Sequence, residues 1–345
     1  MIDRDKISSE IEKKSKEENP EKKPLSILED VEDFIETYTK HILGEERVSI
    51  GYDNLNKYIT GWRKKSVYTI IGGTGMGKSL YLANLAVQAA KSGSNVIIFT
   101  LEMEAYSYAA RIYSILTNIE TLDLVVPGID KRIREGMKMR VPKNTGHLYV
   151  VDYNPKEVSV YDLAKDVEKM DVDLVIVDYA ELLSATTDRK DAYYLEINDI
   201  FYGLKTIAKA LGLPIITAAQ MNRSGYSKYG GTEEFVGLRN VQGSLGITQV
   251  SDVVFSINYS IEDKECGRIN LDIVKNRYGV SDVRLSFSVD YSKSTITDFG
   301  FTSVDVIDNN LSTNKEPPKP VKTKKANAPL NKKQLEKILR RKINE

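Results

Sequence analysis

A short glycine-rich segment has the residue types and spacing of a phosphate-binding loop. It fits the pattern G-x-x-x-x-G-K-[S/T] and reads Gly72, Gly73, Thr74, Gly75, Met76, Gly77, Lys78, Ser79. Glycines let successive backbone N–H groups point at phosphate oxygens, and the helix that follows adds the positive end of its dipole. We expect this loop and the adjacent Leu80 to bind a nucleoside triphosphate, with Lys78 at the β- and γ-phosphates and Ser79 on Mg²⁺. An ordinary glycine-rich turn is the alternative interpretation.

Three other polar side chains follow apolar runs that have the composition of buried strands. Asp178, Glu102 and Gln220 each come at or just beyond the end of such a run. The carboxyl ends of parallel strands gather ligands at one edge of a sheet. We therefore predict that Asp178 holds Mg²⁺ together with Ser79, and that Glu102 orients the attacking water. Gln220 is expected to sense the γ-phosphate. Each could instead be a plain strand-end residue, and Glu104 competes with Glu102 for the catalytic role.

Alternating strand and helix signals must position these side chains. Apolar runs predict strands over residues 67–71, 95–100, 147–151, 172–177, 214–218 and 253–257. Apolar residues at helical spacing predict helices over residues 78–91, 105–118, 158–170 and 193–211. Strands separated by helices form a mostly parallel, twisted sheet flanked by helices, so the expected fold class is α/β. Strands over residues 269–274, 283–289 and 294–297 follow without helices and predict an antiparallel C-terminal extension.

Composition divides the chain into four expected parts. Residues 1–24 are charged, with few large apolar side chains, and are expected to be disordered. Residues 25–47 carry apolar side chains at spacings of three and four, which predicts an amphipathic, linker-like helix. Residues 48–305 hold the α/β domain, and residues 306–345 form a basic tail rich in proline and lysine.

Charge and cysteine content exclude several other kinds of protein. The chain has 49 basic and 49 acidic residues, so no overall charge points to nucleic acid or a membrane surface. Cys266 is the sole cysteine, which excludes an intrachain disulfide and fits a reducing compartment. No apolar run approaches the roughly 20 residues of a membrane span, so we expect no membrane partner. We expect a cytoplasmic protein, in a bacterium or in a host cell if a virus encodes it.

Four short motifs, in this order along the chain, resemble one family. They are residues 100–103 (TLEM), 177–179 (VDY), 219–223 (AQMNR) and 275–279 (KNRYG). With the phosphate loop, they make the chain similar, over about residues 25–290, to the C-terminal ATPase domain of DnaB-type hexameric replicative helicases. The resemblance implies a RecA-like P-loop NTPase fold and ATP with Mg²⁺ as cofactors. The sequence departs from the family in one respect, because only residues 1–24 precede the linker-like helix, so we expect a short form without the family's large helical N-terminal domain.

The resemblance adds site residues and partners. It implies that Glu102 is the catalytic base, and that Lys275 and Arg277 reach the nucleotide of a neighbouring subunit. It implies a homo-oligomer, expected to be a hexameric ring, that translocates on single-stranded DNA, and it suggests primase or a helicase loader as further partners. The family's DNA-contacting loop corresponds here to residues that include Arg239, Asn240, Gln242, Gly243 and Ser244.

Two other functions fit the same motifs. A RecA-fold ATPase for recombination or signalling shares the phosphate loop and Asp178 but does not unwind duplexes. An accessory single-stranded-DNA-binding or loading ATPase would rely mainly on the basic tail. Unwinding of a forked duplex separates a helicase from the first alternative, and deletion of the tail tests the second.

Overall fold

The computed structural model describes residues 47–185, 193–220 and 245–299, together with residues 31, 32, 35, 36 and 38. The predictions for residues 1–24 and 306–345, and for most of the helix over residues 25–47, lie outside these residues. The five described positions between residues 31 and 38 are helical. Among the described helices, none has the length and apolar character needed to cross a membrane.

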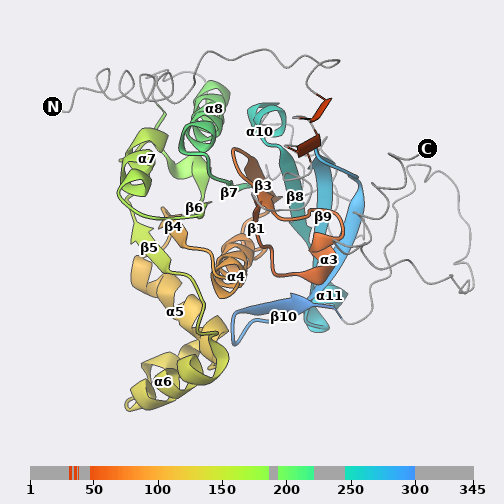
Figure 1. Cartoon of the computed structure of the whole chain (residues 1–345). Coiled ribbons are helices and arrows are strands. Elements are labelled where there is room, and N and C mark those ends of the chain that lie inside the picture. The colour runs from red at the N-terminus through yellow and green to blue at the C-terminus, as the bar shows by residue number, and fades with distance from the viewer. Residues whose placement is uncertain are drawn as a thin grey trace, which may run out of the picture.

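A nine-stranded sheet forms the centre of the domain (Figure 1). Its strand order is β11-β10-β9-β8-β3-β7-β6-β4-β5. The strands are β3 (Val67–Gly72), β4 (Val96–Thr100), β5 (Leu148–Asp152), β6 (Leu174–Asp178), β7 (Ile215–Gln220), β8 (Val253–Asn258), β9 (Arg268–Asn276), β10 (Val283–Asp290) and β11 (Thr295–Asp298). The run from β5 to β8 is parallel, and β9, β10 and β11 each pair antiparallel with the strand before them. The mostly parallel α/β sheet and its antiparallel extension are therefore confirmed.

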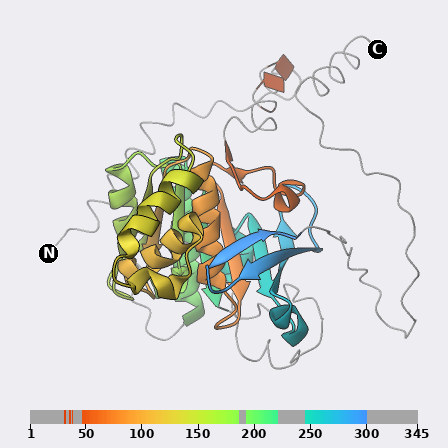
Figure 2. The same ribbon diagram turned by 90° about the horizontal axis from the view of Figure 1, so that it is seen from below.

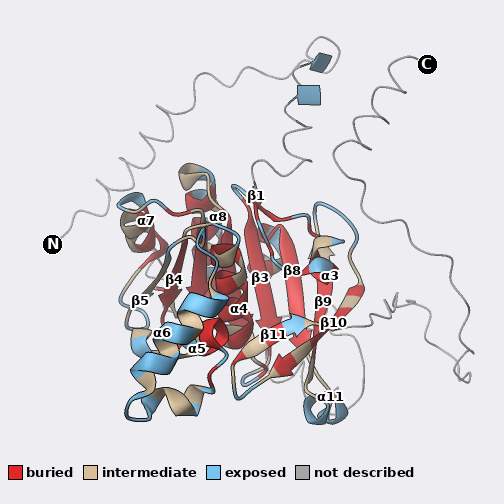
Figure 3. Cartoon of the chain, turned by 60° about the horizontal axis from the view of Figure 1, so that its bottom comes forward, coloured by how far each residue is buried: buried red, intermediate tan, exposed pale blue. Residues whose placement is uncertain are grey.

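Helices cover both faces of the parallel part of the sheet. Helices α4 (Lys78–Lys91) and α5 (Ala105–Thr117) pack on one face, and α7 (Val160–Glu168), α8 (Tyr193–Leu211) and α10 (Leu245–Val250) pack on the other. Strand β4 shows how the two layers arise, because Val96 and Ile98 join the first core and Ile97 and Phe99 join the second. Strands buried on both faces need the continuous apolar runs seen in the sequence. Figure 3 shows these strands as the most buried part of the domain.

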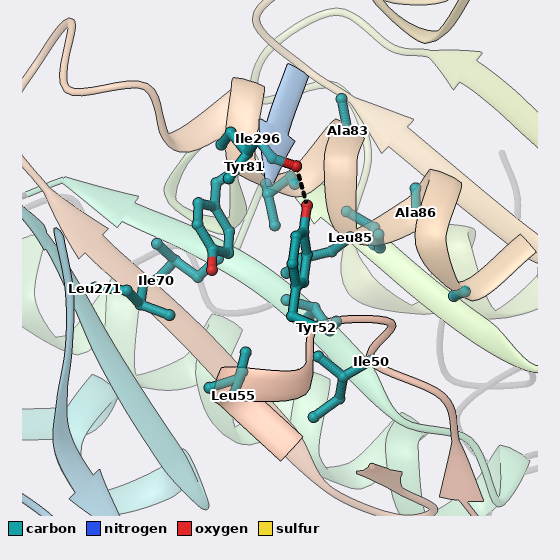
Figure 4. Close-up of a cluster of buried hydrophobic side chains, with 14 of the residues drawn as sticks. Ile50, Tyr52, Leu55, Ile70, Tyr81, Ala83, Leu85, Ala86, Leu271 and Ile296 are labelled. Carbon is teal, nitrogen blue, oxygen red and sulfur yellow. Dashed lines mark hydrogen bonds between the residues drawn. The ribbon is translucent and has the colours of Figure 1, made fainter. Parts of the chain in front are cut away.

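The antiparallel extension is tied to the parallel core by aromatic side chains. Tyr52 and Tyr81 lie side by side in the apolar cluster of Figure 4, with ring centroids 6.2 Å apart. The Tyr52 hydroxyl donates to the Ile296 carbonyl of β11 at 3.2 Å. Tyr52 precedes the short helix α3 (Asp53–Asn56), so the segment before β3 closes over α4 and β11. This packing fixes α4, and with it the phosphate loop, against the sheet. Figure 2 shows β10 and β11 extending beside the helices.

Several short elements have no counterpart among the sequence predictions. They are β1 (Arg47–Val48), β2 (Trp62–Arg63), η1 (Thr121–Val125), α6 (Ile129–Arg140), η2 (Ala180–Leu182) and α11 (Ile261–Glu265), besides α3 and α10. Helix α6 has no fully buried residue, and its half-buried Ile129, Ile133 and Met137 form only a narrow apolar stripe. It packs on α5 through Gly136, where an added Cβ would lie 2.8 Å from the Cβ of Thr117.

Candidate active site

The predicted site residues follow four strands that are neighbours in the sheet. In the order β3-β7-β6-β4, these strands end at Gly72, Gln220, Asp178 and Thr100. Gly72 pairs with Gln220, and Thr100 pairs with Asp178, so the strand ends lie level with one another. Their carboxyl ends therefore gather the phosphate loop, Gln220, Asp178 and the Glu102 turn at one edge of the sheet.

The phosphate loop has the backbone geometry that its glycines permit. Gly75 and Gly77 have φ angles of 76° and 86°, in the left-handed region that side chains with a Cβ disfavour. Gly77 is the N-cap of α4, so the first N–H groups of that helix face the loop. The Lys78 ammonium donates to the carbonyls of Gly72 at 3.0 Å and Gly73 at 3.1 Å. Leu80 is buried in the core and anchors the start of α4.

Lys78 lies among three carboxylates. Burial lowers the pKa of Lys78, and the negative charges of Glu181, Asp178 and Glu102 oppose that change, Glu181 most strongly. These charges therefore favour the cationic form of the half-buried lysine. A partly desolvated ammonium at the mouth of a helix N-terminus is suited to polyanionic phosphate.

Asp178 has the environment of a cation ligand. It is 1% exposed, and neither carboxylate oxygen has a partner in hydrogen-bond geometry within the described part of the chain. Burial raises the pKa of Asp178 to about 6, while the adjacent Ser79 hydroxyl lowers it and the Glu102 charge raises it further. A buried carboxylate with no well-formed hydrogen bond is costly, and a divalent cation would compensate it. Asp178 and Ser79 together therefore fit a Mg²⁺ site.

Glu102 and Gln220 lie on either side of this pair. Glu102 is exposed in the turn after β4, whereas Glu104 is the residue immediately before α5. The Gln220 side-chain amide donates to the Thr74 hydroxyl at 2.7 Å, which joins the end of β7 to the phosphate loop. The structure therefore brings Glu102 and Gln220 to the same edge as Lys78.

Three side chains near the loop were missed by sequence reasoning. Glu181 lies in η2, three residues after Asp178, and accepts a hydrogen bond from the backbone N–H of Gln220 at 2.7 Å. Tyr259 donates to the Gly75 carbonyl at 3.3 Å, and Tyr108 donates to the Ser79 carbonyl at the same distance. An acidic residue just beyond Asp178 was the available signal for Glu181, whereas the tyrosines depend on tertiary packing.

Comparison with known proteins settles the family. The model of the DnaB-like helicase C-terminal domain matches residues 47–295. The chain belongs to this family. The replicative DNA helicase DnaB of Pasteurella multocida is 30% identical over 288 residues, which cover 78% of this chain and 60% of that protein. The DnaB helicase of Helicobacter pylori is 28% identical over 237 residues, covering 66% of this chain and 47% of that protein.

A solved structure shows the same fold. A DnaB-like replicative helicase, studied with its interactions with primase, superposes with a TM-score of 0.66 at 16% identity. The match covers 85% of this chain and 75% of that one. The RecA-like fold of the DnaB-like domain is thereby confirmed. The chain spans about half to three fifths of the length of the curated relatives cited above.

Lys275 and Arg277 lie at the opposite edge of the sheet of this DnaB-like domain. Arg277 donates to the Asp252 carboxylate at 3.1 Å, and the backbone N–H of Val67, at the start of β3, donates to the same carboxylate at 2.8 Å. Lys275 donates to the carbonyls of Thr248 and, at 2.7 Å, Ser251. The length of β3, on the order of 15–20 Å, separates this edge from the phosphate loop. Neither cation reaches the nucleotide site of its own chain.

The predicted DNA contacts cannot be placed in the DnaB-like domain. Arg239, Asn240, Gln242, Gly243 and Ser244 fall within residues 221–244, which lie outside the described residues. The flanking elements are described: β7 ends beside the phosphate loop and α10 packs on α8. The assignment of these five residues stays a prediction.

Asp178→Asn is expected to stabilise the nucleotide-free domain in a pH-dependent way. The folded-state pKa of about 6 exceeds the ordinary value of 3.8, so the wild-type fold loses stability as pH rises through this interval. Between low pH and pH 8, the free energy of unfolding of the asparagine variant should gain at most about 3 kcal/mol relative to that of wild type. Thermal unfolding without nucleotide from pH 4 to 8 measures this difference. An advantage that does not change with pH would contradict the burial argument.

Proposed function

We propose that the domain is an ATP-driven replicative DNA helicase that translocates on single-stranded DNA. The observation that carries the proposal is the division of catalytic groups between two edges of one sheet. Lys78, Asp178 and Glu102 gather at one edge, whereas Arg277 lies at the other. A second copy must therefore complete each site, which couples hydrolysis to assembly.

The residues of the chain have distinct roles in the proposed reaction. Loop N–H groups and Lys78 bind the β- and γ-phosphates, and Gln220 contacts the γ-phosphate from the end of β7. Glu102 accepts a proton from the attacking water and fixes its direction, and its exposure leaves room for that water. Arg277 of a neighbouring copy stabilises the negative charge that develops on the γ-phosphoryl group, with Lys275 beside it. Gln220 then transmits the loss of the γ-phosphate to residues 221–244.

The proposed cofactors are ATP and Mg²⁺. Ser79 and Asp178 would hold the cation, and the unsatisfied, buried carboxylate of Asp178 supports this assignment. Bound Mg²⁺ would neutralise phosphate charge. The α4 N-terminus and Lys78 would supply positive charge to the phosphates.

The proposed assembly is a ring of identical copies, expected to be hexameric. Arg277 can serve a nucleotide only across an interface, and head-to-tail interfaces that close generate rings. The described apolar positions before the domain are exposed, with Val31 at 43%, Ile35 at 46% and Tyr38 at 53%. The predicted bounds of the linker-like helix, residues 25–47, are wrong at their last residue, because Arg47 lies in β1. We propose that the helical segment that includes Val31, Ile35 and Tyr38 lays this face on an adjacent copy.

We propose that the ring translocates on single-stranded DNA. The residues proposed to contact the DNA in the centre of the ring are Arg239, Asn240, Gln242, Gly243 and Ser244. Backbone and amide groups of this kind hold phosphates without reading bases. Primase and a helicase loader are further proposed partners, because the relatives are named as replicative helicases. The cytoplasm is the proposed location for the same reason. The solved relative was itself studied with primase.

Unwinding of a forked duplex tests the proposed function directly. With ATP and Mg²⁺, the full chain should separate a fork that has single-stranded arms, and a non-hydrolysable ATP analogue should not support separation. DNA-stimulated hydrolysis without any strand separation would favour a RecA-fold ATPase of recombination or signalling. Separation that requires a second helicase, with loss of DNA binding on removal of residues 306–345, would favour an accessory loading ATPase.

A further inference from the structure

Glu181 is a buried carboxylate to which the proposed reaction assigns no role. It lies in η2, directly after β6, and is 9% exposed. Burial raises the pKa of Glu181 to about 7, against the lowering effects of the Gln220 N–H bond and of the Lys78 and Lys156 charges. Burial of a carboxylate costs folding free energy unless hydrogen bonds or opposite charges compensate it.

Glu181 has a specific hydrogen-bond partner at the strand end. The backbone N–H of Gln220, the last residue of β7, donates to a Glu181 carboxylate oxygen at 2.7 Å. The side chain of Gln220 in turn donates to Thr74 of the phosphate loop at 2.7 Å. One carboxylate therefore fixes the backbone of the residue whose side chain contacts the loop.

The negative charge of Glu181 also raises the pKa of the phosphate-binding lysine, Lys78. Of the three carboxylates that act on Lys78, Glu181 has the largest effect, larger than Asp178 or Glu102. The other cation near Glu181 has a different partner, because the Lys156 ammonium binds Glu196 at 2.6 Å.

We propose that Glu181 is a positioning residue that, through Gln220, holds the end of β7 against Thr74 of the phosphate loop. Its carboxylate oxygen accepts the backbone N–H of Gln220. The side-chain amide of Gln220 is thereby kept beside Thr74. This inference rests on the proposed ATP hydrolysis, but not on duplex unwinding.

The test compares Glu181→Ala with Glu181→Gln, using the full chain with ATP and Mg²⁺ in the absence of DNA. The alanine variant removes the acceptor, whereas the glutamine variant keeps an oxygen that can accept the same N–H. Loss of a hydrogen bond to a charged group corresponds to a fall in kcat of about ten- to a hundredfold. KM for ATP is expected to change less than threefold, and glutamine should restore most of kcat. Glu196→Ala is the matched control and should leave kcat unchanged.

Three results would overturn the inference. The first is an alanine variant with wild-type kcat, and the second is a glutamine variant whose kcat is as low as that of the alanine variant. The third is an alanine variant whose KM for ATP rises by the same factor as its kcat falls. If the alanine variant does not fold, a cycle with Gln220→Ala, Glu181→Met and the double variant decides instead, because methionine keeps the length of the side chain without the carboxylate acceptor. If the two residues act as one unit, kcat of the double variant should be little lower than kcat of Gln220→Ala alone. Additive losses of kcat would contradict the link. If wild type hydrolyses ATP but unwinds nothing, the helicase proposal fails while this test stands.

Discussion

Arg277→Ala is expected to lower ATP hydrolysis by about 10³- to 10⁵-fold, because a trans arginine stabilises the γ-phosphoryl charge in the transition state. Nucleotide affinity of each chain should stay near that of wild type, since Arg277 lies at the edge of the sheet away from the phosphate loop. The fold should tolerate the change, because Lys205 and the Val67 N–H still donate to Asp252. Steady-state hydrolysis and binding of a fluorescent ATP analogue measure the two effects separately.

Arg132→Ala provides the control for charge removal. Arg132 lies on α6, where its half-exposed side chain is 3.8 Å from Asp123, a pair that contributes little. This variant should hydrolyse ATP at the wild-type rate. An Arg277 variant that keeps its hydrolysis, or that loses nucleotide binding to the same extent, would refute the trans assignment.

Glu102→Gln is the second substitution with a large expected effect. The amide cannot accept a proton from the attacking water, so kcat should fall about 10²- to 10⁴-fold. Binding of ATP should be retained or strengthened, because Glu102 adds negative charge beside Lys78 and Asp178. Single-turnover hydrolysis measured with ATP-binding isotherms separates the chemical step from affinity.

Glu104→Gln is the matched control for this variant. Glu104 is also exposed and only two residues away, but it is the residue at the start of α5. Its substitution should change kcat less than about threefold, the size of a surface charge effect. If Glu104→Gln proves the more damaging of the two, the catalytic base has been assigned to the wrong carboxylate.

The sheet was predictable because its strands are buried on both faces. Apolar runs such as Val96–Thr100 and Leu174–Asp178 alternate along the chain with helical patterns, and they have few interpretations other than buried strands. Helix α4 spans the predicted residues, with Gly77 as its N-cap. Helix α8 ends at the predicted Leu211, and Gly212 with its positive φ angle follows it. Helix α6 was not predicted, because charged residues fill most of its sequence and only a narrow stripe of half-buried residues contacts α5.

The site was predictable where strand order alone brings residues together. Asp178 and Gln220 are the last residues of the neighbouring strands β6 and β7, so a parallel sheet brings them to the same edge as Lys78. Glu181 required the course of the chain after β6, which a 3₁₀ turn determines. Asp252, which pairs with Arg277, required the β8 and β9 register, and sequence spacing does not give that register.

A mixing experiment tests the central claim, that each catalytic site is shared by two copies, most directly. Lys78→Ala lacks the phosphate lysine and Arg277→Ala lacks the trans arginine, so each variant alone should be almost inactive. In an equal mixture that exchanges subunits, an intact loop meets an intact arginine at about a quarter of the interfaces, and hydrolysis should recover toward that fraction. Failure of any mixture to recover hydrolysis, although the two variants co-assemble, would contradict the shared site.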